Sequence, residues 1–265
     1  MERQLFDACG TGDFDQVIEL NDPQIDINWQ NDYFRTPLYI ACEKGQTGVV
    51  KLLLNDKRIH INQADGSGKT HFYIACEYGH LEIVKLLSKD ERVEVSKPNI
   101  FGQTPFYIAC EKGHTGIVKL LLNDERIDVN TAGDASLMSP FWIACYGERI
   151  EVVKLLLNDE RVDINKGNTF GHTPFHALCF FGYVEIMEYI IASGREIKNL
   201  NAIDNDGKTP IGLAREREIE EIDENWESEE EFQKRKRDCT KVVELLESFE
   251  RNPIEMRFNL KIKHG

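Results

Sequence analysis

Short apolar runs alternate with polar turns along the chain, and residues 99–130 show the pattern most clearly. Thr104-Pro105 pairs a hydroxyl suited to capping a helix with a proline suited to its first position. Residues 106–110 are mostly apolar and include a small alanine and a cysteine. Gly113 interrupts, and residues 117–122 then place apolar side chains on one broad helical face. The segment predicts two short helices joined by a tight turn.

The same sequence motif recurs with a period near 34 residues. Its anchors are Thr36-Pro37, Thr70-His71, Thr104-Pro105, Ser139-Pro140, Thr173-Pro174 and Thr209-Pro210, at intervals of 34, 34, 35, 34 and 36 residues. An Asn or Asp stands five positions before each anchor, and a glycine usually stands two positions before it. These residues favour turns. Repetition at this period is typical of a solenoid.

Neither helix of one copy can bury its apolar face alone, so each copy needs others stacked above and below it. We predict an all-α solenoid of about seven helix-turn-helix repeats with short β-turn fingers. The copies lie at about residues 1–30, 31–64, 65–98, 99–132, 133–167, 168–203 and 204–250. They form one predicted domain, residues 1–250, whose first copy is an N-terminal cap. Residues 251–265 are expected to be a short tail.

The phrase Thr104-Pro105-Phe106-Tyr107-Ile108-Ala109-Cys110, followed by Gly113-His114 and a Leu-rich second helix, resembles the motif of the ankyrin repeat family. The resemblance covers roughly residues 3–248. It implies stacked helical repeats and non-catalytic protein binding, in a concave groove made by the turn tips and the exposed side of the first helices. It does not identify the partner, because a fold alone does not define a ligand.

The sequence departs from the family motif in three ways, and each departure predicts a local difference in structure. His71 replaces the usual proline and should weaken the start of its helix. Glu148-Arg149 replaces the usual Gly-His, so this loop between two helices should be irregular. An Asp-x-Arg corner follows the second helix in place of Gly-Ala, at Asp56/Arg58, Asp90/Arg92, Asp124/Arg126 and Asp159/Arg161. We expect a lattice of surface ion pairs between adjacent repeats there, each stabilising by at most about 1 kcal/mol.

The last copy contains an insert at residues 215–238, which is acidic at first and basic over residues 234–237. Its apolar residues are Ile219, Ile222, Trp226 and Phe232, whose spacing predicts a prolonged first helix followed by a turn back. We interpret the insert as a solvated helical extension. The alternative is a docking arm with Trp226 as its anchor. As a nuclear import signal, the basic tetrad is weak evidence, because such runs are common.

Composition and charge narrow the function classes. The chain has 265 residues, of which 41% are hydrophobic and 29% charged, and it contains no apolar run long enough for a membrane span. Its first residues do not resemble a signal peptide. The net charge of −14 disfavours nucleic acid and anionic lipid, since both require a basic surface. We expect a monomer without nucleic-acid or membrane partners, located in the cytoplasm, with the nucleus as the alternative.

The cysteines and histidines do not indicate a disulfide, metal or catalytic site. Six cysteines, Cys9, Cys42, Cys76, Cys110, Cys145 and Cys179, share one repeat position, where stacking separates them by about 10 Å. That is too far for disulfides, and no Cys-x-x-Cys pair suits zinc. We interpret them as buried small side chains of a protein in a reducing compartment, and Cys239 as an exposed thiol. No histidine has a nucleophile partner, so we predict no enzyme activity, metal or cofactor.

An aromatic column recurs at the repeat spacing, at Tyr39, Tyr73, Tyr107 and Trp142. In the family motif the aligned residue is a histidine held between repeats. The resemblance therefore favours packing for this column, and contact with a partner is the alternative.

The candidate binding residues vary between copies, whereas the framework does not. By resemblance they lie in the fingers and after the Ala-Cys pair: Tyr33, Arg35, Lys69, Tyr78, Phe101, Gln103, Met138, Tyr146, Phe170, His172, Phe180 and Phe181, with Trp226 in the insert. Aromatic residues are typical interface hot spots, and copies four to six are richest in them. We predict that this patch holds the apolar anchor of a protein partner. The alternative function is an accessory or targeting subunit of an enzyme complex that docks through residues 215–238.

Overall fold

The structure is a computed structural model that describes residues 1–133, 135–198, 200–219 and 228–264. These residues fold into two compact units, Met1–Asp134 and Ala135–Gly265. The first unit contains α1 (Glu2–Thr11), α2 (Phe14–Leu20), α3 (Pro37–Glu43), α4 (Thr47–Leu54), α5 (His71–Glu77), α6 (Leu81–Ser88), α7 (Pro105–Lys112) and α8 (Thr115–Leu122). The second contains α9 (Pro140–Tyr146), α10 (Ile150–Leu157), α11 (Pro174–Phe181), α12 (Val184–Ser193), α13 (Pro210–Ile219), α14 (Glu229–Arg251) and α15 (Pro253–His264).

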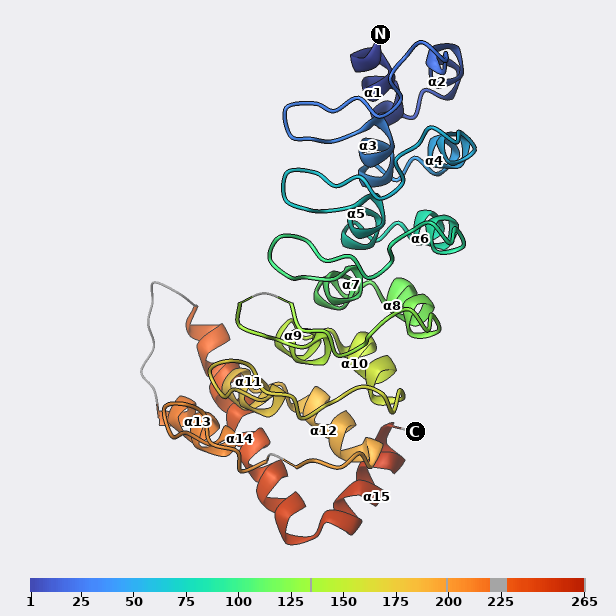
Figure 1. The fold of residues 1–265 in the computed structure, drawn as a ribbon. Helices are drawn as coiled ribbons and strands as arrows, with labels where there is room; N and C mark the ends of the chain where they lie inside the picture. Colours follow the sequence, from blue (N-terminus) through green and yellow to red (C-terminus); the bar gives the residue numbers. More distant parts are fainter. Residues whose placement is uncertain (134, 199, 220–227, 265) are drawn as a thin grey trace. The chain divides into compact units, whose positions relative to one another are not determined.

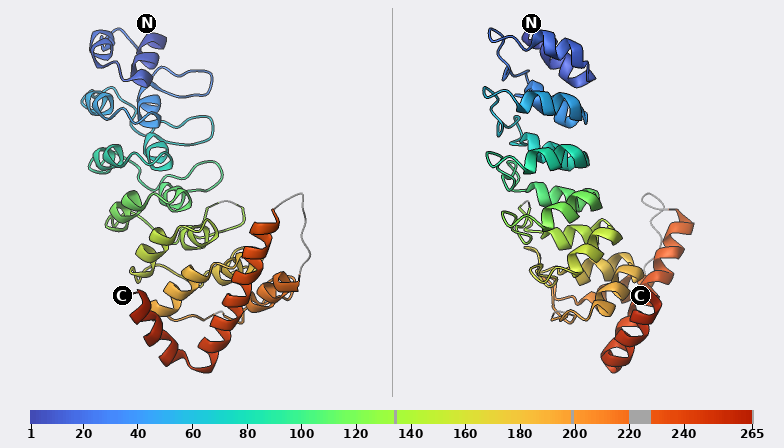
Figure 2. Two further views of the ribbon diagram at one scale, coloured as in Figure 1. Left: turned by 180° about the vertical axis from the view of Figure 1, so that it is seen from behind. Right: turned by 90° about the vertical axis from the view of Figure 1, so that its right-hand side faces the viewer.

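The first unit is a stack of four helix pairs (Figures 1 and 2). The first helices, α1, α3, α5 and α7, contact one another in sequence and form one row. The second helices, α2, α4, α6 and α8, form a parallel row, and long loops project from the side of the first row. The predicted helical repeat is therefore confirmed, and each loop corresponds to a predicted finger.

The anchor dipeptide fixes where each first helix begins. The hydroxyl of Thr36 accepts a hydrogen bond from the backbone N–H of Tyr39 at 3.1 Å, and Pro37 occupies the first turn. Ser139 caps α9 in the same way through the N–H of Trp142, also at 3.1 Å. The hydroxyl thereby satisfies one backbone donor that has no partner inside the helix.

The first helices provide most of the core. Every residue of α3 is buried, and Cys42, like its five counterparts in the other copies, is completely buried. The aromatic column is buried as well, which confirms its packing role. In the first unit the Tyr39 hydroxyl donates to the carboxylate of Asp65 in the next copy at 2.9 Å. Tyr39 therefore joins apolar packing to a polar contact between copies.

His71 does not change where its helix begins, although it replaces the usual proline. The helix begins at His71 and keeps the cap from Thr70. The buried ring bridges two copies, with Nδ1 2.7 Å from the carbonyl oxygen of Ile61 and Nε2 2.8 Å from the hydroxyl of Thr36. Because a carbonyl only accepts, Nδ1 donates and Nε2 accepts. Burial lowers the pKa of His71 to about 4, so the ring is neutral at pH 7.

The fingers are turns that hydrogen bond to the fingers of neighbouring copies. In the first unit the N–H of Gly66 donates to the carbonyl of Tyr33 at 3.1 Å, and the N–H of Ile100 donates to Ser67 at 3.0 Å. The turn requires a positive φ two positions before the anchor, which glycine adopts most easily. Phe34 occupies that position in the second copy with a φ of 61°.

The Asp-x-Arg corners form ion pairs within one corner rather than between repeats, so the predicted lattice is wrong. Arg58 pairs with Asp56 two residues away, at 2.7 Å. Its Nη1 also donates to three backbone carbonyls of the first copy, at Asp22, Pro23 and Ile25. At this corner the first and second copies are therefore joined by hydrogen bonds from Arg58 to the main chain.

The second unit continues the repeat through α9 to α12 and then departs from it. Glu148 occupies the irregular loop before α10 with a φ of 53°, a left-handed conformation in a non-glycine residue. The insert lengthens α13 as predicted, and its described remainder extends the N-terminal end of α14. This long helix contacts α11, α12 and α13 (Figure 2).

Two predictions for the last copy are wrong. Cys239 is completely buried, because α14 crosses α11 and brings its sulfur within 3.6 Å of the Cys179 carbonyl. The predicted tail is helical over α15, which packs on α12 and α14 with Leu260 buried. Residues 220–227, which include Trp226, lie outside the described residues.

The neutral state of His71 predicts a pH-dependent stability. The unfolded chain protonates this ring near its ordinary pKa of 6.5, whereas the folded chain does so only near 4. The neutral ring therefore makes its full contribution to the free energy of unfolding above pH 6.5. This contribution falls by about 3 kcal/mol as the pH drops to 4. Chemical denaturation should show a larger loss over this window for the wild type than for His71→Pro. His60→Gln, at an exposed site, should retain the wild-type behaviour; parallel curves for wild type and His71→Pro would contradict the assignment.

Arg58 and Arg92 form a matched pair for testing the corner contacts. Both pair with the aspartate two residues earlier, but only Arg58 also reaches main-chain carbonyls of the preceding copy. Arg58→Gln should therefore lower the melting temperature by a few degrees more than Arg92→Gln. Thermal unfolding followed by circular dichroism measures the difference, and equal shifts would refute a role in joining copies.

Candidate functional site

Three copies carry the same ion pair between the finger and the end of the first helix. The residue before the helix cap pairs with a glutamate eight positions later. The pairs are Arg35–Glu43 at 3.1 Å, Lys69–Glu77 at 2.8 Å and Lys208–Glu216 at 2.6 Å. Two of the candidate binding residues, Arg35 and Lys69, are therefore occupied by contacts within the protein.

The fifth and sixth copies have different residues at the same two positions. Met138 and Tyr146 replace the pair in the fifth copy, and His172 and Phe180 replace it in the sixth. A pocket of about 420 Å³ opens here, within the second unit. We call it the aromatic pocket, and it is lined by Trp142, Tyr146, His172, His176, Ala177, Phe180, Phe181, Asp204, Asp206, Lys208 and Leu213. Its volume lies in the range of sites that receive a ligand or a side chain.

Ring contacts order the apolar wall of the aromatic pocket. Trp142 and Tyr146, one helical turn apart on α9, are stacked with centroids 5.3 Å apart and planes 17° apart. Phe181 meets Tyr146 edge to face at 5.3 Å, and it meets Phe180 in the same way at 4.9 Å. These geometries suit the charge distribution of aromatic rings. The wall is therefore preorganised in the absence of a partner.

The other wall of the aromatic pocket is polar. His172 Nε2 lies 3.2 Å from Oδ2 of the buried Asp204, and its ring is stacked on His176. Burial opposes ionisation of Asp204, but the backbone N–H groups of Lys208 and Asp206 and the nearby histidines outweigh it, so its pKa is lowered. Burial also lowers the pKa of His176. Asp204 is therefore a carboxylate at neutral pH, held by the finger of the last copy.

Most polar atoms of the aromatic pocket already have partners. Trp142 donates its indole N–H to the His172 carbonyl at 3.0 Å, and His176 lies 3.2 Å from the carbonyl of Lys208. Asp206 is exposed, and no side-chain hydrogen bond or ion pair of its carboxylate is found within the described ranges. The surfaces left for a partner are ring faces and this carboxylate.

The structure brings together four predicted site residues, Tyr146, His172, Phe180 and Phe181. Phe170 lies beside them, 54% exposed, with its ring 6.3 Å from that of His172, and Met138 is half-buried. The other described candidates, Tyr33, Arg35, Lys69, Tyr78, Phe101 and Gln103, belong to the first unit. The predicted patch therefore contracts to the fifth and sixth copies, and Phe101 is not one of the residues lining the aromatic pocket.

Sequence reasoning missed several residues of the aromatic pocket. Trp142 was assigned to packing, but it packs and also lines the pocket, while Asp204 and Leu213 come from the last copy. A signal was present in the sequence, namely that Met138 and Tyr146 in the fifth copy, and His172 and Phe180 in the sixth, replace the basic residue and the glutamate spaced eight residues apart. It becomes meaningful only when the pair is seen as a contact.

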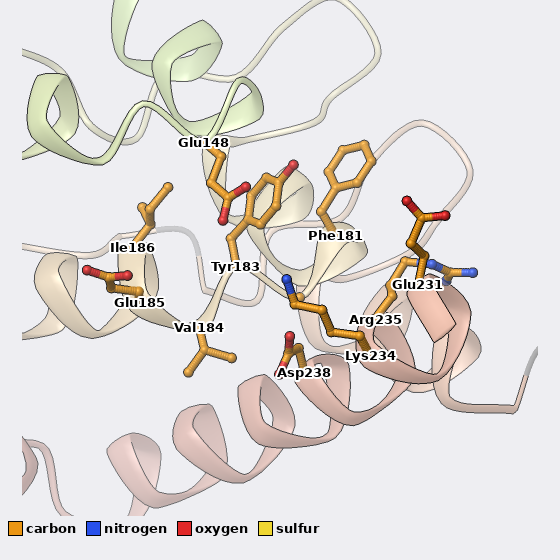
Figure 3. A pocket seen from close by; sticks show the side chains of 11 residues that line it. Glu148, Phe181, Tyr183, Val184, Glu185, Ile186, Glu231, Lys234, Arg235 and Asp238 are labelled. Atoms are coloured by element: carbon orange, nitrogen blue, oxygen red, sulfur yellow. The ribbon is translucent and has the colours of Figure 1, made fainter. Parts of the chain in front are cut away.

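The insert contributes to a second pocket of about 620 Å³, which Phe181 and Tyr183 also line (Figure 3). Glu231, Lys234, Arg235 and Asp238 project from α14 toward it, as the close view shows. Phe232 is buried, and Arg235 and Lys236 lie over its ring at 5.4 and 5.5 Å. The described part of the insert is thus packed against the unit rather than solvated on all sides.

The histidines of the Gly-His positions serve as structural bridges. His80 and His114 each place Nε2 2.9 Å from a main-chain carbonyl of the preceding copy, at Glu43 and Glu77 respectively. Among the described residues no group of three His, Cys, Asp or Glu side chains is arranged to hold a metal ion. No described helix is long and apolar enough to cross a membrane.

Comparisons with known proteins identify the family. The model for ankyrin repeats (3 copies) matches residues 5–99, 91–168 and 141–222. The ankyrin repeat domain of human ASB11 superposes with a TM-score of 0.65 at 23% identity, covering 87% of this chain and 96% of that one. The ankyrin repeat domain of Bcl-3, a member of the IkappaB protein family, gives 0.69 at 21% identity, covering 79% and 92%.

At these identities the two solved structures indicate a common fold alone. A search of curated proteins gave no match. The three family-model matches extend over residues 5–222, which is more than half of the sequence, and agree with the observed helix pairs. The chain belongs to the ankyrin repeat family.

Proposed function

We propose that this protein is a non-catalytic scaffold whose aromatic pocket receives an anchoring side chain of a partner protein. Ankyrin repeats are generally protein-interaction scaffolds and typically lack catalytic activity. The observation that carries the proposal is the replacement of a finger–helix ion pair by rings in two adjacent copies. An internal pair occupies this face in the second, third and last copies, whereas here the rings surround a pocket.

Exposure of the rings supports this choice. Tyr146 is 47% exposed although it is stacked on a buried tryptophan. Covering such a ring with a partner removes apolar area from water, worth about 25 cal/mol for each Å². Because the rings are already ordered, a partner incurs little entropic cost in arranging them.

An accessory subunit that docks through the insert is a second candidate. It is favoured by the contribution of α14 to the pocket in Figure 3, where Lys234 and Glu231 are exposed. That pocket is lined mainly by charges of both signs, and its aromatic lining is limited to the stacked pair Phe181 and Tyr183. We therefore place it second.

Location and oligomeric state remain proposals. A reducing compartment, the cytoplasm with the nucleus as the alternative, agrees with seven buried thiols that form no disulfide. A monomer without nucleic-acid partners agrees with the net charge of −14. Light scattering of the purified chain measures the oligomeric state.

Removing the exposed rings should abolish partner binding. Tyr146→Ala combined with Phe181→Ala removes two rings of the apolar wall of the aromatic pocket. The buried Trp142 is retained to preserve the core. Quantitative capture from the source cell should show partners that are retained by the wild type and lost from the double variant. Tyr78→Ala is the matched control, because Tyr78 is an exposed aromatic at the position equivalent to Phe181. Unchanged capture by a folded double variant rules out this site.

A charge reversal separates the two candidates. Lys234→Glu changes the charge of the pocket beside α14 and leaves the aromatic pocket intact. We expect capture to be unchanged, because the partner does not use this surface. Loss of the same partners from Lys234→Glu, with normal circular dichroism, favours docking through the insert instead.

A further inference from the structure

The aromatic pocket has the chemistry to select a particular kind of anchor. We propose that it binds the guanidinium group of an arginine side chain on the partner protein. This inference rests on the proposed function, since it specifies the anchor of the same pocket. Three observations support it. Cations lie over aromatic rings elsewhere in the protein, carboxylates line the pocket, and the rings of the pocket are stacked.

In the first unit, the finger cation covers the ring of the aromatic column in its own copy. Arg35 lies over Tyr39, 5.3 Å from the ring centroid, and Lys69 lies over Tyr73 at 5.6 Å. The face of an aromatic ring is negative and attracts a cation. The second and third copies therefore satisfy this ring position with a positive side chain.

The fifth copy lacks that cation. The column residue is Trp142, the aromatic side chain with the strongest attraction for cations, and the finger residue is the uncharged Met138. No lysine or arginine lies over the Trp142 ring in the described part of the chain. That ring is buried and stacked on Tyr146, so the aromatic face left for a cation from outside is that of Tyr146, which is 47% exposed.

The same pocket wall is shown to accept a guanidinium. Arg217 of α13 lies 3.9 Å from the ring centroid of Phe180, the shortest such contact in the described residues. It does not line the aromatic pocket itself. Stacking of a guanidinium on the rings of this cluster is thus compatible with the packing around them.

The charge of the aromatic pocket favours a cation as well. Two carboxylates, Asp204 and Asp206, and one ammonium, Lys208, line it. Lys208 is paired with Glu216 at 2.6 Å, and Asp204 contacts His172, which leaves the carboxylate of Asp206 at the rim. An apolar anchor would desolvate Asp206 without replacing its hydrogen bonds. A cationic anchor supplies them.

Shape selects arginine over lysine. The Trp142–Tyr146 stack and the His172–His176 stack both contribute ring faces to the pocket. A guanidinium is planar, is weakly hydrated and can stack on rings while it donates two parallel hydrogen bonds to one carboxylate. An ammonium is compact and strongly hydrated, so it gains less from flat walls.

The test uses the full chain and four short peptides. These are acetyl-Gly-Xaa-Gly-amide with arginine, lysine, norleucine or citrulline, the last being an uncharged analogue of arginine. Binding is followed by the NMR signal of the Trp142 indole N–H, identified with Trp142→Phe. The arginine peptide should shift this signal saturably, with affinity about tenfold higher than the citrulline and norleucine peptides. The affinity of the lysine peptide should lie between that of the arginine peptide and those of the citrulline and norleucine peptides.

Two variants locate the contacts. Asp206→Asn should lower the affinity for the arginine peptide by about three- to tenfold, and Tyr146→Ala should lower this affinity at least as much. Asp32→Asn, the same charge change at an exposed finger of the first unit, should leave the affinity unchanged.

Outcomes for the peptides and for partner capture are separate. Equal binding of norleucine and arginine peptides, no saturable shift with arginine, or full affinity in Asp206→Asn each overturns the arginine assignment. Capture lost from the Tyr146 and Phe181 double variant would then still support protein binding at the aromatic pocket. Capture retained by that double variant refutes the proposed function, whatever the peptides do.

Discussion

The structure depends on one constraint: a pair of helices seven to ten residues long cannot bury its own apolar faces. Short helices are unstable in water unless packing supports them. α3, buried along its whole length, can exist only between α1 and α5. This explains the constant period, since each copy must present the same surface to the next. It also explains the cysteine position, because only a small side chain fits where neighbouring first helices approach.

Stacking creates a second requirement, namely that the polar groups trapped between copies need partners. The Tyr39 hydroxyl reaches Asp65, His71 bridges Thr36 and Ile61, and other copies use equivalent contacts. These side chains connect copies and tolerate little change. Variation is therefore concentrated in the finger residue and at the end of the first helix, which face solvent. The aromatic pocket arises at these two positions.

The end of the stack meets the same constraint by other means. In the last copy the second helix is part of the long α14, which packs on α11, α12 and α13, and α15 then packs on α12 and α14. Gly182 shows how close this cover is, since a Cβ there would lie 2.9 Å from the backbone nitrogen of Cys239. The cap thereby fixes α11, whose C-terminal end supplies Phe180 and Phe181 to the aromatic pocket.

The sequence by itself determined the repeat, the helix starts and the buried aromatic column, because periodicity and capping are local signals repeated six times. Four residues of the aromatic pocket, Tyr146, His172, Phe180 and Phe181, were also predicted from the sequence, whereas Trp142 was understood only as packing. Tertiary structure decided the burial of Cys239, 60 residues from its contact at Cys179, and the main-chain contacts of Arg58. It also decided that the rings of two copies and the carboxylates of a third line one pocket. These depend on which copies meet in space, and a single irregular insert has no repeat from which its partner can be inferred.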